Sequence, residues 1–361
     1  MASKVWFSPA RGTPEKNRLQ QIDELLARVR LADRFGEGDL VAIKTHWGEA
    51  GNTAFVPSFF VRRVVRAVRK TGARPFVTDT NTLYRERRHD AVDNLRTAAA
   101  NGFTAETLGC PLVIADGLVG TDGRDVIVPG AVHGSTARIA SAIVESQGMV
   151  VVSHVKGHMV FGFGGALKNL GMGCCTTSAK QRLHADVRPM VEVDLCTGCA
   201  TCVAHCRFGA IAMERTADGT LARIDHGVCS GCGECVVVCP VEAIPIRWDG
   251  DPGRTQEKTA EVARAAVLGK ETRTVYLNFL TAVTPDCDCC SWSDASLIPD
   301  VGVLASSDPV AVDMASLDLI REAAGGRDVF RERRDIDPMP LLRHAAGLGL
   351  GSIEYRLERL D

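Results

Sequence analysis

Short apolar runs alternate with longer amphipathic segments along most of the chain. Six of the runs have the length of β-strands, and their alternation with helix-length segments predicts an α/β domain with a largely parallel sheet and flanking helices. The predicted strands are residues 40–44, 75–79, 112–116, 149–153, 274–279 and 301–305. Apolar residues also recur at helical spacing in residues 56–72 and 136–146, so each segment is predicted to be a helix, the first ending at Gly72.

Two stretches between the fourth and fifth predicted strands repeat one cysteine pattern. Residues 194–211 and 227–244 both contain C-x2-C-x2-C-x3-C, followed by two residues and Ala-Ile. This spacing is typical of two [4Fe–4S] clusters, in which three cysteines of one motif share a cluster with the fourth cysteine of the other motif. The first predicted cluster has Cys196, Cys199, Cys202 and Cys239 as ligands, and the second has Cys229, Cys232, Cys235 and Cys206. Three neighbouring glycines fit loops that bend sharply around sulfur, namely Gly198, Gly231 and Gly233. Zinc is disfavoured, because zinc sites rarely use four cysteines in such a compressed and duplicated spacing.

Residues 191–248 resemble a bacterial two-cluster ferredoxin domain, which is a small α+β unit. The first motif has Arg207 where such domains usually have a proline, whereas the second motif keeps Pro240. Because proline is not a ligand, this departure concerns the cluster potential and not the presence of a cluster. Predicted strands lie on both sides of the segment, so we expect it to be inserted into one discontinuous α/β domain made of residues 1–190 and 249–361.

Polar residues follow four of the predicted strands. Thr45, His46 and Trp47 follow the first strand, Asp79, Thr80 and Asn81 the second, His154, Lys156 and His158 the fourth, and Ser306, Ser307 and Asp308 the sixth. Ligands of open α/β sheets bind outside the carboxyl ends of the strands. We therefore predict one convergent site there, with His46, His154, Lys156 and His158 as its candidate catalytic residues. The alternative is that these loops are polar only because loops usually are.

The stretch "GFGGALKNLGMGCC" (residues 162–175) places glycines before a short helical pattern. Gly164 and Gly165 could form a backbone nest for an anion at a helix N-terminus. The stretch is not a Walker A motif, because Leu167 precedes Lys168 and Asn169 follows it. The glycines could equally mark tight packing.

Four stretches resemble the DUF362 family of iron–sulfur proteins, and the resemblance runs nearly from end to end of the chain. They are "IKTHWGE", "VTDTNTLY", "HVKGHMVFGFGGALKNLGMGC" and "PDCDCCSWSDASLIPDVG". The resemblance implies an architecture but no defined reaction. It also implies that relatives carry cysteines at the positions of Cys174, Cys287 and Cys289, whereas Cys175 and Cys290 are accessory.

Cysteines outside the ferredoxin-like motifs gather in two further loops, after the predicted strands 149–153 and 274–279. We hypothesise a third metal centre, with Cys174, Cys287 and Cys289 as its ligands. Three cysteines would leave one iron of a cluster open to a substrate or to another side chain. A zinc site, a redox dithiol and reduced structural cysteines are the alternatives.

Composition narrows the classes of partner. The net charge is −2, which gives no electrostatic case for nucleic acid or for acidic membranes. The N-terminal residues lack the apolar core of a signal peptide, and no apolar run approaches the roughly 20 residues needed to span a bilayer. The 14 cysteines are mostly clustered, which favours metal binding over disulfides. We therefore expect a cytoplasmic protein.

These features together predict an oxidoreductase. Electrons would pass between an external low-potential donor or acceptor protein and the two inserted clusters, and then to a substrate at the strand ends. His154 and His158 would supply protons. A small anionic substrate would be held by residues from three loops, namely Lys44, Lys156, Lys168, Asn169, Gly164 and Gly165. Two alternatives are an electron-transfer module that docks to a larger complex without its own substrate, and a carrier of iron–sulfur clusters.

Overall fold

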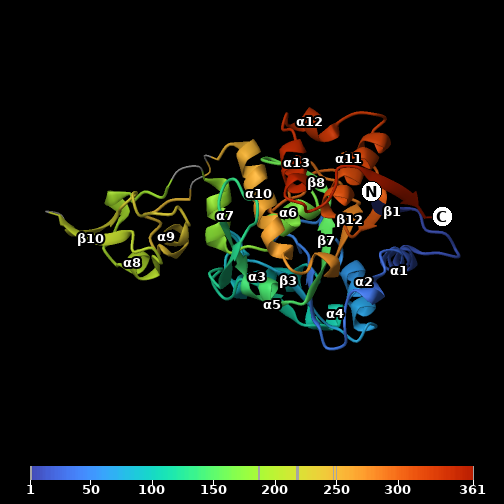
Figure 1. Ribbon diagram of the computed structural model, residues 1–361, viewed down its shortest axis with the longest axis horizontal. Helices are drawn as coiled ribbons and strands as arrows, with labels where there is room; N and C mark the ends of the chain where they lie inside the picture. Colours follow the sequence, from blue (N-terminus) through green and yellow to red (C-terminus); the bar gives the residue numbers. More distant parts are fainter. Residues whose placement is uncertain (1, 186–187, 217–218, 247, 249, 361) are drawn as a thin grey trace.

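The computed structural model describes residues 2–185, 188–216, 219–246, 248 and 250–360 (Figure 1). An eight-stranded sheet has the order β14-β1-β13-β12-β7-β2-β3-β4. Its strands are β1 (Ser3–Pro9), β2 (Leu40–Lys44), β3 (Arg74–Asp79), β4 (Leu112–Ile114), β7 (Gly148–His154), β12 (Thr274–Leu280), β13 (Gly302–Ser306) and β14 (Tyr355–Arg359). All six predicted strands are present, and the α/β prediction with a largely parallel sheet is confirmed. β13 is the exception in direction, since it runs antiparallel to both β12 and β1.

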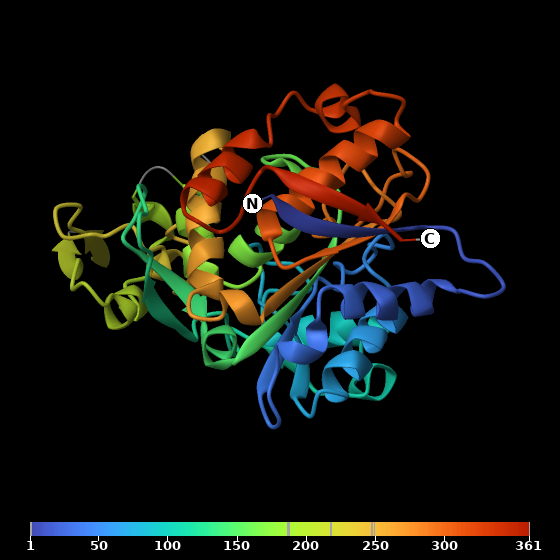
Figure 2. The same cartoon turned by 45° about the vertical axis from the view of Figure 1, so that its right-hand side comes forward.

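Helices cover both faces of the sheet (Figure 2). On one face lie α6 (Ala166–Gly171), α10 (Pro252–Val267), α11 (Pro309–Ala323) and α13 (Met339–Gly347), and on the other lie α1 (Arg18–Arg28), α2 (Ser58–Arg69), α3 (Ala91–Ala100) and α4 (Ala105–Leu108). Successive residues of the central strand β7 alternate between the two hydrophobic cores: Met149 and Val151 pack in the first, Val150 and Val152 in the second. This alternation follows from the two-residue period of a strand and explains why the predicted strand is apolar throughout.

The prediction of one helix over residues 136–146 is wrong. Residues Thr136–Ala140 form β6, which pairs antiparallel with β5 (Gly123–Ile127), and only Ser141–Glu145 form a helix, α5. Ala137 and Ile139 are buried at strand spacing, and Ile143 is buried from the following helical turn. A short segment with these apolar positions fits a helical period as well, so the period alone could not separate the two.

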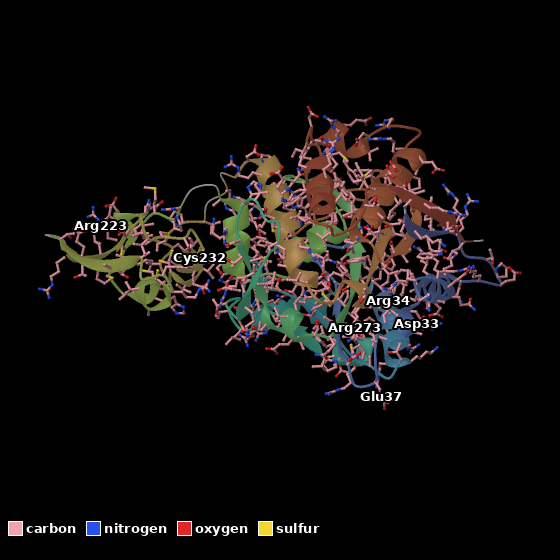
Figure 3. All side chains as sticks on the ribbon, viewed as in Figure 1. Asp33, Arg34, Glu37, Arg223, Cys232 and Arg273 are labelled. Carbon is pink, nitrogen blue, oxygen red and sulfur yellow. The ribbon has the colours of Figure 1, made fainter. Side chains whose placement is uncertain are left out.

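Residues 191–246 form a small unit that projects from the α/β body beside α7 (Thr177–His184), at the left of Figure 1. It contains α8 (Thr201–His205), α9 (Glu234–Val238) and the antiparallel pair β10 (Ile211–Thr216) and β11 (Gly219–Ile224). Its own hydrophobic cluster includes Cys202, Cys235 and Ile244. Figure 3 places Cys232 toward the α/β body and Arg223 on the outer side of the unit.

The remaining elements are short. They are β8 (Lys156–His158), β9 (Gly162–Gly164), α12 (Val329–Arg333) and the 3₁₀ helices η1 (Leu31–Asp33), η2 (Val193–Leu195) and η3 (Glu271–Arg273). Among the described residues, no helix combines the length and the apolar character that a membrane span requires.

Candidate active site

A cavity of about 230 Å³ lies at the carboxyl ends of β2, β3 and β7. Twelve residues that the sequence singled out line it: Lys44, His46, Asp79, Thr80, Asn81, His154, Lys156, His158, Gly165, Lys168, Asn169 and Cys289. Polar residues after three different strands therefore do converge. Ser306 and Asp308 do not join them, because β13 runs antiparallel and its carboxyl end points to the opposite edge of the sheet. Asp308 instead caps α11 by accepting a hydrogen bond from Ala311 N at 2.8 Å.

A fully buried carboxylate, Asp288, organises one wall of the cavity. Its Oδ1 lies 2.7 Å from His154 Nδ1, and its Oδ2 lies 2.8 Å from Lys156 Nζ. Burial alone would raise the pKa of Asp288, but the charges of His154 and Lys156 hold it well below its usual range. Asp288 lies between Cys287 and Cys289 in the sequence, and the pattern of cysteines did not predict its contacts.

His154 is held at both ring nitrogens. Its Nε2 lies 2.9 Å from the carbonyl oxygen of Thr281 and 3.1 Å from that of Ala282, while Nδ1 faces Asp288. Both nitrogens therefore face acceptors within the protein. This arrangement fits a histidine that fixes Asp288 and not the predicted role of passing protons to a substrate.

Lys44 and Asn169 are also engaged within the protein. Lys44 Nζ lies 2.8 Å from Asp79 Oδ1 and donates to Asn169 Oδ1 at 2.7 Å. The Asn169 amide in turn donates to the carbonyl oxygen of Val152 and to Ser153 Oγ, both at 3.0 Å. The predicted substrate contacts of Lys44 and Asn169 are thus replaced by contacts that tie β7, α6 and β3 together.

Arg88 completes this buried network, and sequence reasoning missed it. Its guanidinium lies 3.1 Å from Glu49 Oε2 and 3.5 Å from Asp79 Oδ2, and it donates to Tyr84 Oη at 2.8 Å. Arg88 is 2 % exposed. The surrounding sequence, "RERRH", is that of a solvent-exposed segment, so nothing local marked one of its arginines as buried.

Two lysines that line the cavity contact no carboxylate in the described part of the chain. Lys168 Nζ lies 3.4 Å from Cys287 Sγ, and Lys180 Nζ donates to Thr80 Oγ1 at 2.9 Å and to the carbonyl oxygen of Cys175 at 2.7 Å. Apolar side chains, including Leu83, Phe161 and Trp248, line the same space. The cavity therefore offers positive charge beside an apolar surface.

His46 is the histidine best placed to act on a bound molecule. Its Nδ1 accepts a hydrogen bond from Gly48 N at 2.9 Å, so the neutral ring carries its proton on Nε2. Burial, together with the nearby charge of Arg88, lowers the pKa of His46 to about 3. The ring is therefore neutral at physiological pH and presents an N–H donor.

Among the described residues, one group of three His, Cys, Asp or Glu side chains is compact enough to hold a single metal ion. It consists of His158, Cys287 and Cys289. Their ligand atoms all lie within 4.8 Å of one another, so the group could hold a metal ion. A hydrogen bond from Cys289 lowers the pKa of Cys287 far below its usual value, against burial and with the help of Lys168. The same hydrogen bond raises the pKa of Cys289.

Cys174 is not a member of this compact group, whereas Cys287 and Cys289, the other two predicted ligands of the third centre, are. Cys174 is fully buried in the first hydrophobic core, and its sulfur lies 3.9 Å from the carbonyl oxygen of Asn169. Burial raises the pKa of Cys174 to about 12. His158, from β8, is the third member of the group.

The N-terminus of α6 binds a carboxylate of its own chain. Ala166 N and Leu167 N donate to the two carboxylate oxygens of Asp313 at 2.7 and 2.9 Å. A side chain at Gly165 would collide with Asp313 Oδ1, and Gly164 lies in β9 opposite Lys156. The predicted anion nest of Gly164 and Gly165 is therefore filled by Asp313, and the glycines serve packing.

The eight cysteines of the projecting unit surround two separate cavities. Cys196, Cys199, Cys202 and Cys239 line one, and Cys206, Cys229, Cys232 and Cys235 line the other. Each cavity thus takes three cysteines from one motif and the fourth from the other. Backbone N–H groups face the sulfurs, as in Ala210 N to Cys206 Sγ at 3.3 Å and Gly231 N to Cys229 Sγ at 3.4 Å.

The loops around these cavities bend as a bulky group requires. Gly198, Gly231 and Gly233 have φ values of 69°, 72° and 78°, in the left-handed region that favours glycine. Ala200, the counterpart of Gly233, has a φ of 58°. The cysteine sulfurs of this part of the described chain are also spread more widely than around one tetrahedral zinc ion, where they lie about 3.8 Å apart. The residues therefore fit clusters better than single ions.

Direct contacts join the projecting unit to the cavity wall. Arg85 donates to the carbonyl oxygen of Cys239 at 2.9 Å, and the neighbouring Tyr84 donates to the carbonyl oxygen of Cys289 at 3.2 Å. The rings of His184 and Trp248, which both line the cavity, lie 4.8 Å apart. The loop that holds Tyr84 and Arg85 therefore touches one cysteine cavity and the charged cavity at once.

Comparison with known proteins gives one family. Residues 41–318 match the family model described as "Domain of unknown function (DUF362)". The comparison with curated proteins gave no match. Among solved structures, the chain is similar to the lactate racemase apoprotein from Thermoanaerobacterium thermosaccharolyticum, with 11% identity, a TM-score of 0.44, and coverage of 89% of this chain and 57% of that chain. It is also similar to a protein from Thermotoga maritima, with 10% identity, a TM-score of 0.36, and coverage of 90% and 61%. The chain thus spans roughly three fifths of the length of these two structures.

Proposed function

This chain belongs to the DUF362 family, and we propose that it is an iron–sulfur oxidoreductase that acts on a small anionic substrate in the strand-end cavity. One observation carries the proposal: the eight cysteines of residues 191–246 line two cavities, each with the cross-paired set of four that two [4Fe–4S] clusters use. When bound, the clusters would supply single electrons. We propose residues 191–248 as the domain that holds them and the remainder of the chain as the domain that holds the substrate.

In the proposed reaction, the cavity residues bind and orient the substrate. Lys168 and Lys180 hold its anionic group, because both line the cavity and neither contacts a carboxylate among the described residues. Leu83, Phe161 and Trp248 exclude water from its apolar part. His46, as a neutral ring, donates a hydrogen bond from Nε2–H to the substrate.

Asp288 has a positioning role in this proposal. It fixes Lys156 and His154 at 2.8 and 2.7 Å and so keeps an ammonium group and an imidazole ring immobile at the cavity wall. A preorganised charge costs no reorganisation when charge develops on a substrate. The whole network is buried, which strengthens its interactions.

An electron-donating or electron-accepting protein is expected to dock on the projecting unit. Large apolar side chains are exposed there beside the cysteine motifs, including Val193, Leu195, Phe208 and Val228. Exposed apolar residues of this kind are typical of surfaces that bind other proteins. Docking there would leave the strand-end cavity open.

The test has two parts, both on anaerobically purified full-length protein. The first is iron and acid-labile sulfide per chain, expected at about eight each and at about four in Cys235→Ala. The second is calorimetric titration with benzoate and phenyl phosphate, compared between the native chain, Lys168→Met/Lys180→Met and the control Lys70→Met. Lys70 is exposed at the end of α2 and does not line the cavity.

The outcomes separate the alternatives. Eight irons and anion binding that the double variant loses support the proposal. An iron-free protein, or one that holds zinc in place of iron, overturns it. Eight irons without any anion binding would instead support an electron-transfer module that has no substrate of its own.

A further inference from the structure

Cys287 and Cys289 differ in how they face the strand-end cavity. Cys289 lines it, whereas Cys287 lies behind and is 5 % exposed. Their sulfur atoms are within 4.8 Å of each other and are connected by a hydrogen bond. A disulfide requires about 2.05 Å between sulfurs, so a local movement of the loop would join them.

The sulfur of Cys287 is surrounded by hydrogen-bond donors. Lys168 Nζ lies 3.4 Å away, and His158 also hydrogen-bonds the sulfur. His158 Nδ1 already accepts hydrogen bonds from Val160 N at 3.1 Å and Phe161 N at 3.3 Å, so the neutral ring carries its proton on Nε2. An ammonium group and an imidazole N–H thus face one sulfur atom, which is the environment of a reactive thiolate.

The same orientation of His158 disfavours a metal ion in this group. A histidine that binds a metal through one nitrogen donates the N–H of the other to an acceptor. In His158 the other nitrogen is itself an acceptor of two backbone N–H groups. The geometry therefore suits a proton between His158 and Cys287 better than a metal.

We propose that Cys287 and Cys289 form a redox-active dithiol that exchanges with a small anionic disulfide bound in the cavity. The inference deepens the proposed function and rests on it for the electrons that regenerate the dithiol. Lys168 and Lys180 line the cavity and would hold the negative charge, and Cys289 is the sulfur in reach of the ligand. The volume of about 230 Å³ limits the ligand to a small molecule.

The exchange balances in two steps. Cys289, after passing its proton to the Cys287 thiolate, attacks one sulfur of the substrate, forms a mixed disulfide and releases the other half as a thiolate. Cys287 then attacks the sulfur of Cys289, which forms the Cys287–Cys289 disulfide and releases the second half as a thiol with the proton of Cys287. The substrate gains two electrons and one proton. Two electrons from reduced iron–sulfur clusters, as the class of reductant, and one proton restore the thiol and thiolate.

The experiment uses cluster-loaded full-length protein carrying Cys290→Ser, so that no disulfide can form with that neighbour. The protein is exposed anaerobically to 3,3′-dithiodipropionate, or to bis(2-hydroxyethyl) disulfide as an uncharged probe of similar size. Differential alkylation and mass spectrometry are read on the tryptic peptide 274–321, which then contains only Cys287 and Cys289 as cysteines. Cys110→Ser, at a buried thiol that contributes nothing to the cavity lining, is the control.

The expected result is an intramolecular disulfide, formed at least about tenfold faster with the anionic probe than with the uncharged one. Cys287→Ser should retain a mixed disulfide on Cys289, and Lys168→Met should slow the exchange by about 3- to 10-fold. Cys110→Ser should leave the rate unchanged. The anion preference and the trapped adduct are readouts that a merely structural pair of cysteines would not give.

Two results would overturn the inference. One is that the peptide 274–321 stays fully reduced with either probe, in a variant whose spectra match those of the native protein. The other is one metal ion per chain, beyond the iron of the clusters, that Cys289→Ser removes. Cluster content is measured in the same sample. Disulfide exchange in a protein without clusters would overturn the proposed function but support the dithiol. Clusters without disulfide exchange would support the proposed function but overturn the dithiol.

Discussion

The two cysteine-rich regions of this protein surround their sulfur atoms with different groups. In the projecting unit the neighbours are backbone N–H groups and other cysteines. Burial is the larger cause, and the adjacent cysteines the smaller one, that raises the pKa of Cys235 to about 12. In the strand-end cavity, a hydrogen bond from Cys289, assisted by Lys168 and His158, lowers the pKa of Cys287 against burial. The second region therefore supplies positive charge to a sulfur from its own side chains, whereas in the first region the proposed clusters would have to supply it to Cys235.

The largest expected effect separates the two regions. Cys202→Ala/Cys235→Ala removes one ligand from each cysteine cavity and should lower the iron content from about eight atoms per chain to nearly none. Because the cavity residues come from other elements, binding of benzoate should survive with an unchanged dissociation constant. Loss of anion binding together with the iron would show that the regions are not independent.

The second effect concerns the cavity alone. Asp288→Asn leaves the ammonium of Lys156 buried without its carboxylate, and the expected loss in free energy of unfolding is about 3–5 kcal/mol. Urea denaturation measures it, with Asp286→Asn as a neighbouring control nearer the surface. Iron content should stay at the native value, and a variant of native stability would contradict the assigned role of Asp288.

The third effect is a sensitivity to acid that arises in the cavity wall. Burial lowers the pKa of His46 and of His184 to about 3, below the value of about 6.5 in an unfolded chain. Below about pH 6.5, the unfolded state therefore binds more protons than the folded state. The stability that the two neutral rings provide is complete above about pH 6.5 and is lost progressively as the pH falls toward about 3. At pH 5.5 the two together should cost about 3 kcal/mol relative to pH 7.5.

A matched variant assigns this acid effect. His184→Phe keeps a ring beside Trp248 but cannot take up a proton, so its loss of stability between pH 7.5 and pH 5.5 should be smaller than that of the native chain by about 1.4 kcal/mol. Urea midpoints at both pH values give the comparison. An undiminished difference in the variant would mean that other groups cause the acid sensitivity.

The smallest effect falls on the link between the regions. Arg85→Ala removes a hydrogen bond to Cys239 and an ion pair with Glu242 whose side chains are 39% and 64% exposed. Exposed pairs contribute less than about 1 kcal/mol, so the melting temperature should hardly change. Hydrogen exchange should nevertheless quicken in the loop around Tyr84. Unchanged protection there would show that Arg85 does not hold the loop against the projecting unit.

Much of the fold followed from the sequence because buried parallel strands are apolar throughout, as in β7 and β12. The direction of β13 did not, since an antiparallel strand next to a parallel one carries no different composition, and this misplaced Ser306 and Asp308. The edge strand β14 and its neighbour β1 were not predicted either: β14 reads "YRLER", and its alternation of charged and apolar residues is short and half-exposed.

In the site, residue types at strand ends predicted which side chains converge but not what they contact. Lys44, Asn169 and His154 reached the cavity wall, yet they bind partners within the protein. Those partners, including Asp288 and Arg88, come from distant loops, and only the folded chain shows that their charges balance. The grouping of His158, and not Cys174, with Cys287 and Cys289 illustrates the same limit. The spacing of residues in the sequence does not show which side chains of different elements lie close together.

The placement of β1 also bears on how the chain is made. Its two neighbours in the sheet are β13 and β14, at Gly302–Ser306 and Tyr355–Arg359, so β1 has no partner strand until Gly302–Ser306 have been synthesised. At 5–20 residues per second, this wait lasts roughly 20–60 s. Val5 and Phe7, which are buried in the finished sheet, remain exposed throughout that time. During synthesis, β1 is therefore the strand of the sheet that waits longest for a partner.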